Sequence, residues 1–150
     1  MITTLKNIAF LISGVILLFF SCQYKPFAVN QRDKIGRKQG KWKVWYDDKE
    51  SKLYYSGRYK NNAPQGTFKY YYRTGQFQLK EKYKANKTIL TTYYHMNGKV
   101  DMKGTAQIIL NPDTSIYQWI GQWEKFDTTG KLVEVHTYRN GQRIWVKFIR

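Results

Sequence analysis

Side chains that could run acid–base or metal chemistry are scarce, since the 150 residues include two histidines, one cysteine and ten Asp and Glu. Glu134 and His136 stand two apart, which puts both on one face of a strand, but no nucleophile motif accompanies them. We interpret them as an exposed strand pair, and His95 as a surface residue flanking a turn. A turn also explains the acidic segment 47–50 better than a cation site does. The sequence predicts no enzyme, no catalytic residue, no metal site and no cofactor.

Cations and aromatic rings are abundant instead. The chain has 26 Lys and Arg and a formal net charge of +16, together with 13 Tyr, 8 Phe and 5 Trp. Aromatic side chains supply the burial that disordered chains lack, and the length favours one domain. A single cysteine excludes an internal disulfide framework and a Cys-rich zinc site. These counts favour a binding or structural module.

The N-terminal segment has the pattern of an export signal. Lys6 precedes an uncharged, mostly apolar run over residues 8–20, which as a helix would span only ~20 Å of a hydrocarbon core that is ~30 Å thick. The end of this segment, with Ser21 before Cys22, resembles a bacterial lipobox, although Phe19 stands where such sequences usually have Leu. The resemblance implies cleavage before Cys22 and lipidation of that cysteine. The alternatives are an ordinary secretory signal and an uncleaved signal anchor.

These features predict three parts of the chain. Residues 1–21 are a signal helix of the lipoprotein type, residues 22–35 are a tether, and residues 36–150 form the folded domain. The lipid would anchor the protein in the bacterial envelope, with the outer membrane favoured and the domain outside the cytoplasm. Nucleic acid is therefore not an expected partner, although basic residues interleaved with aromatic ones occur in single-strand binders.

The folded domain contains a repeat. Windows starting at Gly66 and at Gly121 align without gaps, each with an aromatic residue two positions after the glycine, and a window at Gly40 fits with two extra residues at its turn. A degenerate third copy is expected near residues 91–98, with Leu90 in the glycine position, and a truncated copy starts near Trp145. The residues that define the repeat are Gly40, Trp42, Tyr59, Gly66, Phe68, Gly75, Tyr83, Gly121, Trp123, Gly130 and Tyr138.

Each copy has the pattern of a β-hairpin, because runs rich in Tyr, Trp, Phe, Val and Thr alternate with polar residues and end at turns such as 97–98 and 140–141, both Asn-Gly. The fold class expected is all-β, an elongated antiparallel meander of repeated hairpins with roughly nine or ten strands. Alternate residues of a strand point to opposite faces, which predicts an aromatic face and a basic face. The basic face would carry Lys41, Lys43, Arg58, Lys60, Lys69, Arg73, Lys80, Lys82 and Lys84.

The stretch 55–68 resembles the MORN repeat, most closely its bacterial variants. The match rests on Tyr55, Gly57, Tyr59, Asn61, Gly66 and Phe68, while Asn62 stands where the repeat usually has Gly. The resemblance covers most of residues 36–148 and implies an elongated sheet of stacked hairpins. MORN proteins act mostly as scaffolds, membrane-proximal spacers or protein-binding surfaces, and some bacterial variants are labelled antitoxin components.

The function expected is that of a lipid-anchored, non-enzymatic scaffold or binding module for a macromolecule or an anionic envelope component. The contact residues expected on the basic face are Arg58, Lys60, Lys69, Lys80 and Lys82. The alternative is an antitoxin- or immunity-like protein that neutralises one dedicated partner protein. A hydrolase of envelope polymers would need clustered carboxylates, which the sequence does not show.

Overall fold

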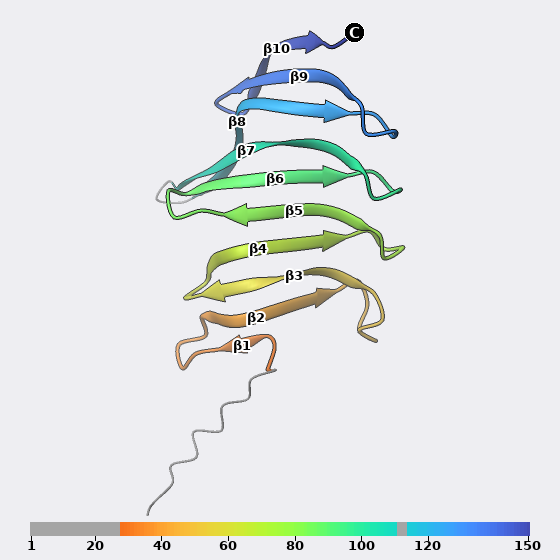
Figure 1. The fold of residues 1–150 in the computed structure, drawn as a ribbon. Coiled ribbons are helices and arrows are strands. Elements are labelled where there is room, and N and C mark those ends of the chain that lie inside the picture. The colour runs from red at the N-terminus through yellow and green to blue at the C-terminus, as the bar shows by residue number, and fades with distance from the viewer. Residues whose placement is uncertain (1–27, 111–113) are drawn as a thin grey trace, which may run out of the picture.

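All the strands of the molecule belong to one antiparallel meander, in which each strand pairs with the next along the chain (Figure 1). This computed structural model describes residues 28–110 and 114–150. The strands are β1 (Gln31–Arg32), β2 (Lys38–Trp45), β3 (Leu53–Lys60), β4 (Ala63–Tyr71), β5 (Phe77–Tyr83), β6 (Thr88–Tyr94), β7 (Val100–Leu110), β8 (Ser115–Phe126), β9 (Leu132–Arg139) and β10 (Gln142–Phe148). The all-β antiparallel meander predicted from the sequence is confirmed. The expected signal helix and Cys22 lie outside the described residues.

The glycines that open the repeats have a shared backbone conformation. Gly40, Gly66 and Gly121 have φ angles of 70°, 67° and 67°, where L residues with a side chain are strained. In β4 this glycine lies in a bulge, because Gly57 of β3 faces the three residues 66–68 while the flanking residues pair regularly. The bulge in β8 has the same form, opposite Gly104 of β7. In β4 and β8 the repeated glycine is thus the residue that lets the chain bulge, whereas Gly40 pairs regularly with Tyr59 of β3.

A second set of glycines makes room for the repeated aromatic rings. The ring of Phe68 lies over Gly57, and the indole of Trp123 lies over Gly104, so closely that neither glycine has space for a Cβ atom. Trp42, Phe68 and Trp123 are all buried. Gly104 is therefore the counterpart of Gly57.

The third copy departs from the others because β6 has no bulge. Lys82 pairs with Leu90, and Glu81 pairs with Thr91, with no extra residues between them. The expectation that Leu90 takes the glycine position is wrong, since no residue of β6 takes it. Thr91 stands where the other copies have a buried ring, and Tyr117 from the long β7–β8 hairpin fills the space, with its hydroxyl 3.0 Å from Thr91 Oγ1.

The hydrophobic core lies on the aromatic face, around the β7–β8 hairpin. Trp119 and Trp123 stack with ring centroids 3.9 Å apart, and Tyr138 packs edge-on against Trp119. The buried members of the core are Ile89, Met102, Ala106 and Trp123, packed by Tyr83, Tyr93, Ile108, Trp119 and Tyr138. The longest hairpin of the sheet places its side chains against those of the neighbouring strands, and this packing gives a thin sheet a hydrophobic core.

The turns after β2, β4 and β6 are tied to the following copy by side-chain hydrogen bonds. The hydroxyl of Tyr46 donates to the carbonyl of Tyr71 at 2.7 Å, and the hydroxyl of Tyr72 donates to that of Tyr94 at 3.2 Å. In the third copy, Nε2 of His95 lies 3.0 Å from the carbonyl oxygen of Phe126. His95 flanks a turn as predicted, but it is a half-buried contact between copies rather than a surface residue.

The strand pair Glu134 and His136 is also more buried than predicted. His136 lies directly opposite the buried Trp123 in the register of β8 and β9 and is itself buried. Its Nε2 contacts the Glu134 carboxylate, and this hydrogen bond holds the pKa of Glu134 below its ordinary value. The pair is therefore part of the packed face of the sheet, where it stabilises β9.

Candidate anion-binding groove

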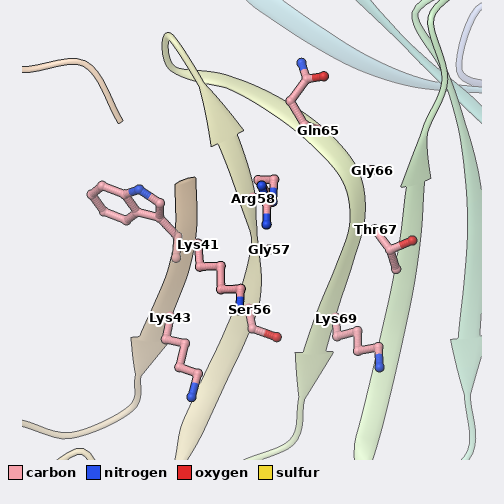
Figure 2. Close-up of a pocket in the computed structure, with 10 residues that line it drawn as sticks. Lys41, Lys43, Ser56, Gly57, Arg58, Gln65, Gly66, Thr67 and Lys69 are labelled. Atoms are coloured by element: carbon pink, nitrogen blue, oxygen red, sulfur yellow. The ribbon is translucent and has the colours of Figure 1, made fainter. Parts of the chain in front are cut away.

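A groove of about 470 Å³ crosses strands β2, β3 and β4 (Figure 2). Its lining is mostly polar or cationic, with Trp42 as its one large apolar residue and the backbone of Gly57 and Gly66 between the side chains. The polar side chains that line it are Lys41, Lys43, Ser56, Arg58, Gln65, Thr67 and Lys69. The chemistry of this lining suits an anion, because ammonium, guanidinium, amide and hydroxyl groups all donate hydrogen bonds.

Strand alternation explains why the cations gather on this side. Trp42 and Phe68 both contact Tyr59, so these rings share one face of β2, β3 and β4. Lys41 and Lys43 flank Trp42, and Lys69 follows Phe68, so their side chains point to the opposite face. The predicted separation of aromatic and basic residues holds for Lys41, Lys43 and Lys69. It is wrong for Arg73, whose guanidinium lies 5.2 Å from the centroid of the Tyr46 ring, and Lys38 of β2 also lies over the aromatic face, 4.8 Å from the ring centroids of Trp42 and Tyr59.

The sheet register lines these residues up in rows across the strands. In the first row, Lys43 pairs with Ser56, Ser56 with Lys69, Lys69 with Lys80, Lys80 with Thr92, and Thr92 with Lys103. The second row is interrupted at the bulge of β4. It contains the pair Lys41 and Arg58 and, on the other side of the bulge, the pair Thr67 and Lys82. The basic side therefore continues beyond the groove to β7.

The five contact residues expected from the sequence are not all in the groove. Arg58 and Lys69 line it, while Lys80 and Lys82 lie on the next strand of the same side. Lys60 is paired with Ala63 at the hairpin end of β3 and does not line the groove. The selection from the sequence left out Lys41, Lys43, Ser56, Gln65 and Thr67. Strict alternation around Trp42 and Phe68 is the signal that finds Lys41, Lys43 and Thr67, and alternation with Tyr55 finds Ser56. Gln65 is not found in this way.

Few acids neutralise this surface. In residues 28–110 and 114–150 the ion pairs are Asp33–Arg37, His95–Asp101, Lys103–Glu124 and Glu134–His136. Of the basic residues in the two rows, only Lys103 has a partner among these pairs, at 2.9 Å. Like charges stand directly opposite each other at Lys41 and Arg58 and again at Lys69 and Lys80, an arrangement that destabilises a sheet. A bound anion would relieve this repulsion.

The described part of the chain offers little for other kinds of chemistry. No three His, Cys, Asp or Glu side chains in it gather as a metal site. Nor does any helix within those residues have the length and hydropathy needed to cross a bilayer. A comparison with protein-family models found no match, and no curated protein has significant sequence similarity to the chain. The groove is therefore the feature on which a function can be argued.

Proposed function

We propose that this protein is a non-enzymatic β-repeat module, MORN-like in its repeat, that binds an acidic macromolecule or an anionic component of the bacterial envelope. One observation carries the proposal: several cations of β2 to β5 share one open side of the sheet and have no acidic partner among the residues that the structure describes. They are Lys41, Lys43, Arg58, Lys69, Lys80 and Lys82. Like charges that face each other on neighbouring strands lower the stability of the fold. Binding of an anionic partner would offset this repulsion by attraction to the partner.

Removal of groove cations tests this proposal. Replacing Lys41, Arg58 and Lys69 with serine should weaken binding to anionic vesicles about a hundredfold, because each cation near an acidic surface contributes ~1 kcal/mol. Co-sedimentation measured over a range of salt concentrations checks it. The matched control replaces Lys34, Lys49 and Lys131, which lie in exposed turns, and removes the same charge. Equal binding by both triple variants would show that net charge, not the groove, attracts the ligand.

We also propose that Cys22 carries a lipid that holds the module in the envelope, with the outer membrane favoured. The support is the apolar segment 8–20 followed by Ser21 and Cys22. Replacing Cys22 with serine should abolish labelling by a palmitate analogue and move the protein from the membrane fraction to the soluble fraction. Labelling that persists in Cys22→Ser, or a wild-type protein that is not labelled, would contradict the proposal.

A dedicated partner protein is the second candidate, as for antitoxin- or immunity-like proteins. The observation that favours it is the exposure of large apolar residues on β10, where Trp145 is 52% exposed and Phe148 is 73% exposed. Aromatic side chains in such positions are typical anchors of protein interfaces. Binding of this kind would survive high salt, whereas binding through the groove would be screened.

A further inference from the structure

The first row of the basic side contains both lysines and residues with a hydroxyl group. Along strands β2 to β7 it presents Lys43, Ser56, Lys69, Lys80, Thr92 and Lys103. Neighbouring strands lie about 4.8 Å apart, so the row is roughly 24 Å long. It runs across the strands, and its two hydroxyl positions separate the cations of β2, of β4 and β5, and of β7.

The row has defined ends. After Lys103 the next residue in register is Glu124 of β8, whose carboxylate forms an ion pair with the Lys103 ammonium, and after it comes the uncharged Val135 of β9. At the other end, Asn30 lies beside Lys43, since its side-chain amide exchanges hydrogen bonds with the Lys43 backbone at 2.9 and 2.8 Å, and no strand among the described residues lies beyond it in the row. A ligand that follows the row is therefore limited to about six strands.

We propose that the basic side of the sheet binds a linear acidic polysaccharide, laid across the strands along this row. The inference rests on the proposed function and names its ligand. An extended polysaccharide advances by about one strand spacing per sugar, so successive sugars meet successive strands. Carboxylates on the sugars pair with the lysines, and the hydroxyls of Ser56 and Thr92 form hydrogen bonds with the sugar hydroxyls.

The same geometry disfavours other polyanions. Single-stranded nucleic acid is held by rings that lie between the cations, but Trp42, Tyr59 and Phe68 pack against one another on the opposite face. A flat lipid surface presents no groups that reach the exposed backbone of Gly57 and Gly66 in the groove. Binding to a lipid surface also leaves the hydroxyls of Ser56 and Thr92 without a specific hydrogen-bond partner. A chain that enters the groove and carries both charges and hydroxyls satisfies all of these groups.

Oligosaccharides of increasing length test the inference. With the full chain in detergent and polygalacturonate oligomers as the probe, calorimetry should show affinity rising from the disaccharide to about the hexasaccharide and then levelling off. The double variant Lys69→Ser and Lys80→Ser should weaken binding of the hexasaccharide about thirtyfold, if each lysine contributes ~1 kcal/mol as it does near an acidic surface. The double variant Ser56→Ala and Thr92→Val should weaken binding of the hexasaccharide severalfold, and by a larger factor than it weakens binding to anionic vesicles.

The outcomes separate this inference from the proposed function. Binding to anionic vesicles without binding to the oligomers would overturn the polysaccharide and leave an anionic partner in place. Absence of binding to both the vesicles and the oligomers would overturn both the polysaccharide and the proposed function. Affinity that does not depend on oligomer length would overturn the path along the row. The same holds if the Lys69/Lys80 variant binds the hexasaccharide as tightly as the matched control, Lys34→Ser and Lys49→Ser. Tighter binding of single-stranded DNA than of the hexasaccharide would favour nucleic acid and contradict the inference.

Discussion

Replacing Gly104 with alanine is expected to lower the free energy of unfolding by ~3 kcal/mol, because the new methyl group would overlap the indole of Trp123. The indole has nowhere to move. It is fully buried, it stacks on Trp119, and its Nε1–H donates to the carbonyl of Thr105 at 3.1 Å. Relief of the overlap must therefore break the core of the β7–β8 hairpin. Urea unfolding followed by tryptophan fluorescence measures the effect.

A matched substitution separates steric overlap from backbone strain. Gly66 has a φ of 67° but open space around the position of a Cβ atom, so Gly66→Ala should cost only ~1–2 kcal/mol, from the left-handed backbone alone. Combining Gly104→Ala with Trp123→Leu should cost less than the sum of the two single changes, since the smaller side chain leaves room for the methyl group. A Gly104→Ala protein as stable as the wild type would show that the ring is not held over this glycine.

The sequence was sufficient for the positions of the repeated glycines and for most of the two faces of the sheet, although not for Arg73. A glycine followed two residues later by a ring marks a bulge and a buried aromatic residue, and this pattern located Gly66 with Phe68 and Gly121 with Trp123. The glycine and the ring lie two residues apart on one strand, so the order of residue types along that strand is enough to find them.

The third copy shows where local pattern stops being sufficient. In β6 the bulge is absent, and Thr91 takes the central position instead of a ring. The ring that fills the space comes from Tyr117, 26 residues further along the chain. Tyr117 can take the place of the missing ring only because of how the β7–β8 hairpin packs on its neighbours. The spacing of residues within the repeat does not predict that packing.

The candidate groove was predictable in part for the same reason. Alternation placed Lys41, Lys43 and Lys69 on one side, but the rows depend on register between strands. Register is set by the bulges, and the two extra residues of the bulge in β4 decide that Arg58 faces Gln65 and Ser56 faces Lys69. The interior position of Glu81 was available from alternation as well, since it stands between two lysines that point outward.

Replacing this interior residue, Glu81, with leucine is expected to lower the free energy of unfolding by ~3 kcal/mol. Glu81 is only 6% exposed, and its carboxylate accepts hydrogen bonds from the hydroxyls of Tyr70 at 2.9 Å and Tyr83 at 3.1 Å. Leucine would leave both hydroxyls without this acceptor. Glu81→Gln keeps an acceptor oxygen and should cost less, and adding Tyr70→Phe and Tyr83→Phe to Glu81→Leu should restore part of the loss. Urea unfolding of the four proteins measures these differences.

The dependence of this effect on pH identifies the interaction. Burial raises the pKa values of Tyr70 and Tyr83, and the charge of Glu81 raises them further. Above pH ~10 the unfolded chain releases its phenolic protons while the folded chain retains them. Stability from these tyrosines is therefore complete below that pH and decreases as the pH rises through it. Because Glu81 contributes to the raised pKa values, these tyrosines should ionise at a lower pH in folded Glu81→Leu than in the folded wild type. The stability difference between the two proteins should therefore narrow only in the strongly alkaline range where the tyrosines of the folded variant ionise. Phenolate absorbance that rises at the same pH in both folded proteins would mean that Glu81 stabilises the sheet without interacting with the tyrosine hydroxyls.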